Sequence, residues 1–298
     1  MISGCPFDIK ENVPLAPFCT WKIGGAARYF IQANSADLPK ILLWAKSKNI
    51  PSCVFGGGSN ILVKDSGVDG LAIRVCDSLG GVKFCGGHFE APAGVRLSAL
   101  SVLLAEKEIA GFEFLAGIPG TVGGAVFMNA GVGGENKREI SDVFLSANLF
   151  NFGRGEFCAD KIYMDFSHRH SSLQNSKDVL VSAKFKIEKS DSAAAIMERI
   201  KKSLKERIAR EPENRRNAGS VFKACGGVPA GVLIDRAGLK GMRAGGAMVS
   251  FKHANWIENT GNASSADVEE LIAKIKRAVF EKFGAELQEE VKILSAEI

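Results

Sequence analysis

Tyrosine and clustered basic residues are scarce in this sequence. Only two of the 298 residues are tyrosines, and no long block of lysine and arginine occurs, although the formal net charge is +5. A nucleic-acid-binding surface needs a basic stripe with interleaved aromatic side chains. The composition therefore disfavours a nucleic-acid partner, and the mild positive charge suits small anionic ligands better.

Cysteine pairs with metal-binding spacing are also missing. The seven cysteines form no C-x-x-C pair and are odd in number, which argues against a disulfide framework and against a zinc site. Several lie in apolar runs such as "PSCVF", "IRVC" and "VKFC", so we expect them to be small core residues.

Long apolar runs are lacking as well. No stretch of about 18 apolar residues could cross a membrane, and "MISGCPFDIKENVP" has no apolar segment of a signal peptide. We therefore expect a cytoplasmic protein without a membrane partner. A hydrophobic content of 46% is enough to build real cores, and the length allows one large or two to three smaller domains.

The periodicity predicts mixed helix and strand. Strands are expected at 28–33, 143–150, 179–187 and 289–294, and helices at 34–50, 96–109, 192–210 and 264–283. Pro212 should end the third helix, and Ser264 with Asp267 should form a capping box at the start of the fourth. The glycine-rich stretch that begins at residue 117 is expected to lack regular structure.

Glycine is abundant instead, with 33 residues, and it is clustered. "FGGGSNILV" can turn successive backbone N–H groups toward one anion. "GIPGTVGGAVFMNAGVGGE" has little charge and small side chains, which suit a chain packed closely along an extended ligand. A tight hairpin is the alternative for the first cluster. Two such loops suit an extended phosphorylated ligand such as a dinucleotide. Neither a G-x-G-x-x-G fingerprint nor a P-loop occurs, so a Rossmann site is not indicated.

The ordered motifs resemble those of one family. They are "TWKIGGAARYF", "FGGGSNILV", "GIPGTVGGAVFMNAG", "SHRHSSLQ", "NAGSVFK", "LIDRAGLKGMRAGGAMVSFKHANWIENTGNASSADV" and "LQEEV". In this order and spacing they resemble the UDP-N-acetylenolpyruvoylglucosamine reductases, the flavin enzymes of bacterial peptidoglycan synthesis. The resemblance covers nearly the whole chain, and the length resembles the shorter form of the family.

The resemblance implies an α+β fold. A vanillyl-alcohol-oxidase-type (PCMH) FAD-binding domain of two subdomains, 1–75 and 76–195, should precede a C-terminal α+β substrate-binding domain, 196–298. It implies non-covalent FAD, NADPH as co-substrate, a UDP-sugar substrate and a monomer. The implied FAD contacts are Gly56, Gly57, Gly58, Ser59, Asn60, Ile61, Gly117, Pro119, Thr121, Gly123, Gly124, Asn129 and Ala130.

Three residues match catalytic positions of the family: Ser220, Arg169 and Glu290. Ser220 should donate a proton to the carbon that becomes a carbanion after hydride transfer from FAD to the enolpyruvyl group. A strong base of this kind does not require a strong acid, and no histidine base is needed. Arg169 should bind the substrate carboxylate with two parallel hydrogen bonds, and Glu290 should polarise the same group. Glu289 competes for that last role, although strand alternation puts the two glutamates on opposite faces.

The substrate-binding residues implied by the resemblance are Lys223, Asp235, Lys240, Lys252, His253 and Asn255. Two departures from the family pattern are His168, where tyrosine is common, and "FKACG" in place of "FKNP". The latter places Cys225 near the serine as an alternative nucleophile, and His253 could instead be a core histidine. Another FAD-dependent sugar or alcohol oxidoreductase and a non-catalytic nucleotide-sugar-binding protein remain alternative functions.

Overall fold

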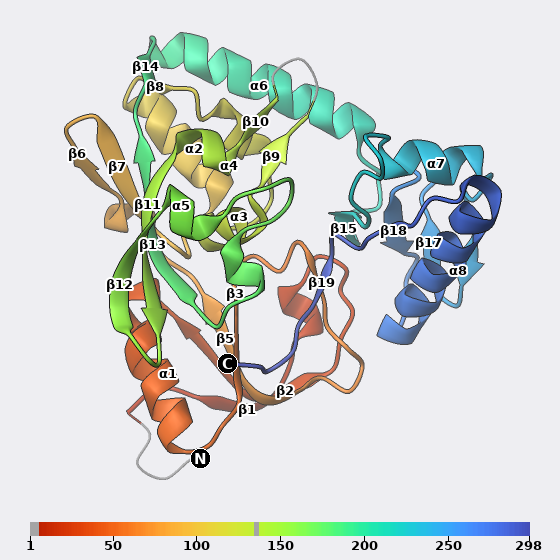
Figure 1. Ribbon diagram of the computed structural model, residues 1–298, viewed down its shortest axis with the longest axis horizontal. Helices are drawn as coiled ribbons and strands as arrows, with labels where there is room; N and C mark the ends of the chain where they lie inside the picture. Colours follow the sequence, from red (N-terminus) through yellow and green to blue (C-terminus); the bar gives the residue numbers. More distant parts are fainter. Residues whose placement is uncertain (1–5, 134–136) are drawn as a thin grey trace.

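The structure of the protein, a computed structural model, describes residues 6–133 and 137–298. Cys5 and residues 134 and 135, at the end of the second glycine cluster, lie outside these ranges. Two sheets with their helices form the larger part, and a smaller unit of sheet and helix lies beyond the end of a long helix, α6 (Figure 1).

The first sheet has the order β1-β2-β5-β3 and combines a parallel core with one antiparallel edge. Its strands are β1 (Lys10–Pro14), β2 (Ala26–Ala33), β3 (Ser52–Phe55) and β5 (Val68–Val75). Helix α1 (Leu38–Ser47) buries its apolar stripe in the same cluster as Leu71 and Ile73 of β5. The strand and the helix predicted in this region are confirmed.

The second sheet is antiparallel, with the order β12-β11-β13-β7-β6. Its strands are β6 (Lys83–Cys85), β7 (His88–Pro92), β11 (Phe144–Asn151), β12 (Gly155–Asp160) and β13 (Val179–Lys186). The accompanying helices are α2 (Leu97–Glu106), α3 (Val122–Met128), α4 (Ile140–Val143) and α5 (Lys161–Met164). Two small strand pairs are added to them: β8 (Ile109–Ala110) pairs with β14 (Lys189–Ser190), and β9 (Gly131–Val132) pairs with β10 (Arg138–Glu139). One hydrophobic cluster extends from Leu38 to Phe89 and Phe185, so the two sheets share a core.

Helix α3 lies inside the stretch that was expected to be irregular. Val122, Val126 and Met128 are buried, and this burial stabilises a helix although a glycine in a helix interior costs about 1 kcal/mol relative to alanine. Asn129 ends the helix in the left-handed region, with φ of 43°. The prediction is therefore wrong for 122–128, because tertiary packing outweighs the low helix propensity of glycine.

The C-terminal unit has a sheet of order β15-β18-β17-β16. Its elements are β15 (Asn217–Ser220), α7 (Ala230–Arg236), β16 (Arg243–Ala244), β17 (Ala247–Val249), β18 (Trp256–Asn259) and α8 (Ser265–Phe283). The predicted capping box is confirmed, since Ser264 Oγ accepts from the Asp267 N–H and Asp267 Oδ2 accepts from the Ser264 N–H, each at 3.0 Å.

Helix α6 (Ala193–Arg210) joins the two parts and ends just before Pro212, as predicted. Its buried Ile196 and Ile200 pack on Ala105 and Ala116, which belong to the part of the chain around the second sheet. The predicted boundary between residues 195 and 196 falls inside the first turn of α6. It assigns most of this helix to the C-terminal domain, although the helix packs on the preceding part of the chain. The three-part division itself stays a prediction.

After α8 the chain returns to the N-terminal part that contains the first sheet. Strand β19 (Lys292–Ile293) is parallel to β4 (Ile61–Leu62), and Ile298 exchanges two backbone hydrogen bonds of 3.0 and 3.1 Å with Ser52. The C-terminus therefore lies beside the start of β3, in the first sheet (Figure 1). The strand predicted at 289–294 is confirmed, although only two of its residues pair as a regular strand.

Two N-terminal segments fix the C-terminal unit in place. Trp21 is fully buried in the cluster that contains Val221 and Val249, and its Nε1 donates to the Ile257 carbonyl at 2.8 Å. The Asp65 carboxylate accepts from the Ser265 N–H at 3.0 Å in the first turn of α8, where the helix dipole favours a negative charge.

The cysteines divide between core and surface. Cys19 and Cys53 are buried, as expected, whereas Cys76 and Cys85 are exposed. Cys85 is on the edge strand β6 and Cys76 follows the end of β5, so the expectation of core positions is wrong for these two. Within the described ranges, no helix is long and apolar enough to cross a membrane.

Candidate active site

A cleft of about 1720 Å³ lies between both N-terminal layers, α6 and the C-terminal unit. Among the predicted site residues, those that line it are Gly56, Gly57, Gly58, Ser59, Asn60, Ile61, Gly117, Pro119, Thr121, Gly123, Gly124, Ala130, Arg169, Ser220, His253 and Glu290. Those outside the lining are Asn129, Lys223, Asp235, Lys240, Lys252 and Asn255. The fold thus brings the three predicted catalytic residues, which are far apart in the sequence, to the lining of one cleft.

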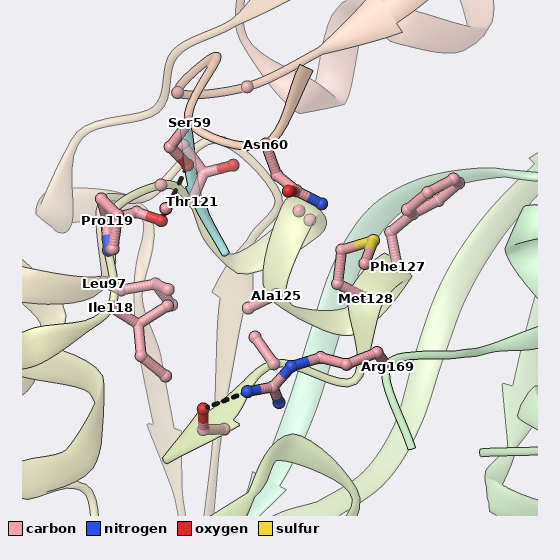
Figure 2. Close-up of a pocket in the computed structure, with 18 of the residues that line it drawn as sticks. Ser59, Asn60, Leu97, Ile118, Pro119, Thr121, Ala125, Phe127, Met128 and Arg169 are labelled. Carbon is pink, nitrogen blue, oxygen red and sulfur yellow. Dashed lines mark hydrogen bonds between the residues drawn. The ribbon is translucent and has the colours of Figure 1, made fainter. Parts of the chain in front are cut away.

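The two glycine loops are packed directly against each other. A Cβ at Gly56 would overlap Thr121 Oγ1, and one at Gly57 would lie 2.8 Å from Gly120 Cα. Ser59 Oγ donates to the Pro119 carbonyl at 2.9 Å, which Figure 2 shows as a dashed line. Part of the glycine content therefore has a structural reason, the close approach of the loops, in addition to any ligand contact.

The first loop also presents free backbone donors to the cleft. Gly58 has φ of +66°, which turns consecutive peptide units toward one side. In the part of the chain that the structure describes, the N–H groups of residues 57–60 donate to no other protein group. In the second loop, by contrast, the Val122 and Gly123 N–H groups donate to Val95 and Ala93 carbonyls at 2.9 and 2.8 Å. The first loop therefore keeps an uninterrupted run of four backbone donors, which suits an anion.

Arg169 is placed by a turn with unusual backbone geometry. Its φ is +55°, in the left-handed region, and the turn is held by Gln174 Nε2, which donates to the Arg169 carbonyl at 3.1 Å. The buried Asn129 donates from Nδ2 to the Ser167 carbonyl at 2.9 Å. The residue predicted to contact the cofactor thus lies behind the wall of the cleft and supports the turn that contains Arg169.

Arg169 and Glu290 form an ion pair in the cleft. Arg169 Nε lies 3.0 Å from Glu290 Oε1, and Arg169 Nη2 donates to the Gly131 carbonyl at 2.9 Å (dashed in Figure 2). Burial raises the pKa of the Glu290 carboxyl above its usual value, although Arg169, His168 and Lys223 oppose the shift. Glu290 thus has a stronger tendency to hold a proton than an exposed glutamate.

Glu289 points elsewhere. Its carboxylate lies 2.8 Å from Lys276 Nζ of α8, and the alternation along the strand directs consecutive side chains to opposite faces. The position beside Arg169 thus belongs to Glu290.

Ser220 lies at the end of β15, opposite Trp256 of β18, where a bulge interrupts the pairing. Gly219, with φ of +76°, allows the turn that presents the serine to the cleft. The next residue connects it to the glutamate, since the Val221 carbonyl accepts from the Glu290 N–H at 2.7 Å. Ser220 and Glu290 are therefore on directly bonded segments.

Of the six predicted substrate-binding residues, one lines the cleft and five do not, and Lys223 among the five is half-buried. His253 lines the cleft, and burial lowers the pKa of its imidazole, with Lys240 and Arg210 adding to the shift. Asn255 is buried, and its amide makes two hydrogen bonds, of 3.0 and 2.8 Å, to the Phe222 backbone. Asp235 and Lys240 pair at 2.7 Å on the surface of the unit, and Lys252 is exposed.

Comparisons with known proteins agree over both parts of the chain. A model of the FAD binding domain matches residues 26–159, and a model described as UDP-N-acetylenolpyruvoylglucosamine reductase, C-terminal domain, matches residues 211–294. The UDP-N-acetylenolpyruvoylglucosamine reductase of Chlamydia muridarum is 39% identical over 300 residues, covering 99% of this chain and 97% of the relative. That of Desulforamulus reducens is 40% identical over 289 residues, covering 96% and 94%.

The crystal structure of UDP-N-acetylenolpyruvylglucosamine reductase from Thermus caldophilus superposes with a TM-score of 0.79 at 32% identity. It covers 96% of this chain and 99% of that one. The chain belongs to the UDP-N-acetylenolpyruvoylglucosamine reductase family. As a member, it is a flavoprotein oxidoreductase of peptidoglycan precursor synthesis. The predicted family and fold class, an FAD-binding domain followed by the C-terminal domain of this family, are confirmed.

One cleft residue of this reductase was missed by the sequence analysis. Lys292 lines the cleft, and burial together with the nearby Lys223 lowers the pKa of its ammonium group. Two residues after Glu290 on an extended segment, it lies on the same face as that glutamate. The strand alternation used to separate Glu289 from Glu290 could have identified it.

Basic residues of α6 were missed too. Arg199, Lys202, Arg207 and Arg210 line the cleft at the spacing of one helix face. Their sequence pattern is that of an ordinary solvated face, and only the docking of α6 on the second layer turns them toward the cleft.

Proposed function

We propose that the enzyme reduces UDP-N-acetylglucosamine enolpyruvate to UDP-N-acetylmuramate, using FAD and NADPH. The single observation that supports this most strongly is the convergence of Ser220, Arg169 and Glu290 in one cleft beside the free N–H groups of residues 57–60. A proton donor, a cation and a buried acid are the groups that reduction of an α,β-unsaturated carboxylate requires.

The residues of the first loop fit FAD. Four consecutive donors and a positive φ at Gly58 suit a pyrophosphate, and the cleft exceeds the roughly 300–1,000 Å³ of a typical small-molecule site, which leaves room for a second ligand. We assign Gly57 to Asn60 to the pyrophosphate and the wall around Gly117 and Ala130 to the rest of the cofactor. When bound, FAD supplies the hydride that NADPH has delivered.

The protein groups act on the substrate. Hydride addition to the terminal carbon of the enolpyruvyl double bond leaves an electron pair on the carbon that bears the carboxylate and the ether oxygen. The Ser220 hydroxyl gives its proton to that carbon, and solvent restores the serine. Arg169 and a protonated Glu290 hold the substrate carboxylate, onto which the charge spreads during the step. General acid catalysis of this kind contributes typically about 10²- to 10⁴-fold.

In this proposal the C-terminal unit binds the UDP-sugar. Lys223, Lys240 and Lys252 lie outside the lining of the cleft, so in this proposal their long side chains bind the part of the diphosphate that extends beyond it, and His253 binds at the edge of the cleft. Asp235 orients Lys240, and Asn255 keeps the Phe222 backbone in place rather than touching the ligand. A monomeric state and a cytoplasmic location stay predictions.

An anaerobic titration tests the function. The purified enzyme is reduced with NADPH while the visible flavin absorbance is followed, and the enolpyruvyl sugar is then added. We expect the absorbance to fall and then return, with UDP-N-acetylmuramate as the product by mass spectrometry. A flavin that stays reduced after the sugar is added refutes the substrate, and recovery with a different sugar or alcohol product identifies another oxidoreductase of the same fold.

A further inference from the structure

Asn60 holds the segment that contains Glu290 with two hydrogen bonds. Its Nδ2 donates to the Glu290 carbonyl at 3.1 Å, and its own backbone carbonyl accepts from the Lys292 N–H at 3.0 Å. The two bonds act on either side of Val291 and thereby fix both the position and the direction of this segment. Asn60 was predicted as a cofactor contact, yet its side chain makes a bond inside the protein.

Glu290 is held from the opposite side by the strand of the catalytic serine. The Glu290 N–H donates to the Val221 carbonyl at 2.7 Å, and the Lys223 N–H donates to the Gln288 carbonyl at 2.9 Å. The Glu290 peptide therefore lies between the first glycine loop and the segment that follows Ser220. Its side chain, with 17% of its area exposed, extends to Arg169.

The arrangement joins the cofactor loop to the acid groups through one residue. In Figure 2 Asn60 extends from the same loop as Ser59, but whereas Ser59 binds the second glycine loop, Asn60 binds the Glu290 segment. A change at Asn60 alters where the Glu290 carboxyl lies relative to the loop, and it leaves the contact between the two loops intact.

We propose that Asn60 is a positioning residue that sets the placement of Glu290 in the oxidative half of the reaction. The inference rests on the role proposed above for Glu290. Removing the amide leaves a part-buried carbonyl without its donor, so the Glu290 segment shifts. Because a displacement of about 1 Å in a catalytic group costs up to about 10²-fold, we expect reoxidation of the reduced enzyme by the enolpyruvyl sugar to slow by about 10- to 100-fold.

The test uses Asn60→Ala and the near-isosteric Asn60→Asp, which puts an acceptor where the Glu290 carbonyl needs a donor. Stopped-flow spectroscopy measures flavin reduction by NADPH and reoxidation by the sugar separately, and fluorescence measures the Kd for FAD. Both substitutions keep the Asn60 backbone N–H that we assign to the pyrophosphate, so in Asn60→Ala we expect reoxidation by the sugar to slow far more than reduction by NADPH. In Asn60→Asp the added negative charge beside the pyrophosphate should also weaken FAD binding, so this variant is assayed at saturating FAD. Ser59→Ala serves as the contrast, with weaker FAD binding expected.

A double-mutant cycle with Glu290→Gln shows whether Asn60 acts through the glutamate. In the Glu290→Gln background, Asn60→Ala should slow reoxidation by less than about twofold further. Additive effects, or an equal slowing of reduction and reoxidation in Asn60→Ala, overturn the positioning role in favour of a direct cofactor contact. If Glu290→Gln alone reoxidises at the wild-type rate, the failure lies in the proposed function of Glu290 and not in the Asn60 contact.

Discussion

The indole of Trp21 is expected to stabilise the C-terminal unit from outside it. Trp21 belongs to the N-terminal part of the sequence, but its ring is fully buried in the C-terminal cluster and its Nε1 donates to the Ile257 carbonyl at 2.8 Å. In Trp21→Phe this carbonyl, on a residue with 1% of its area exposed, loses its donor. A buried polar group left without its partner costs about 1–3 kcal/mol.

Trp44 provides a matched control, since Trp44→Phe makes the same change of ring size. Its Nε1 is buried but has no hydrogen-bond partner among the described residues, so removing it leaves no acceptor unpaired. We therefore expect Trp21→Phe to lower the free energy of unfolding by about 1–3 kcal/mol more than Trp44→Phe does.

Urea denaturation followed by circular dichroism gives the free energy of unfolding. Because a protein with several units need not unfold in one step, hydrogen exchange at the β18 amides shows whether the loss of stability is in the C-terminal unit. Exchange at β18 should accelerate in Trp21→Phe alone. Equal losses in the two variants, or unchanged exchange at β18, would refute the reasoning that this bond stabilises the contact between the units.

Three further changes test the site. Ser220→Ala should retain flavin and its reduction by NADPH while lowering reoxidation by the sugar by about 10²-fold or more, as stopped-flow absorbance would reveal; wild-type reoxidation would exclude the serine as proton donor. Because burial raises the pKa of Glu290, activity that needs its protonated form should be present below that raised pKa and fall as the pH rises through it, and Glu290→Gln should remove this limb from the pH profile; an unchanged limb assigns it to another group. Gly56→Ala should separate the two loops by its overlap with Thr121 and release FAD, as measured by retained absorbance after gel filtration, whereas Gly80→Ala, whose nearest added contact is 3.6 Å, should retain it.

The capping box of α8 gives a prediction for stability. Hydrogen bonds from the Ser264 and Gly246 N–H groups lower the pKa of Asp267 below its usual 3.8. Its contribution is therefore present above the unfolded value and lost as the pH falls through the lowered one. Asp267→Asn should flatten the acid side of the stability curve measured by thermal unfolding between pH 2 and 6, in which case the slope belongs to this residue; an unchanged slope contradicts the assignment.

Local periodicity determined the longer helices and several of the strands. The apolar stripes of α1, α6 and α8, the capping box and the end of α6 before Pro212 follow from residues within one or two helical turns. The motifs with their order indicated the family, and strand alternation separated Glu290 from Glu289. The helix α3 was missed because its stability comes from burial against distant residues and not from its own glycine-rich sequence.

What only the tertiary structure decided is how distant segments meet. The sequence indicated that Asn60 and Asn255 touch ligands, but the fold gives their side chains backbone partners 230 and 33 residues away. It also brings Lys292 and one face of α6 to the cleft, and it closes the two glycine loops on each other. Periodicity shows which face of an element is buried. The hydrogen bonds that place Glu290 between the first glycine loop and the strand of Ser220 form only because the last strand, β19, pairs with β4 in the N-terminal part.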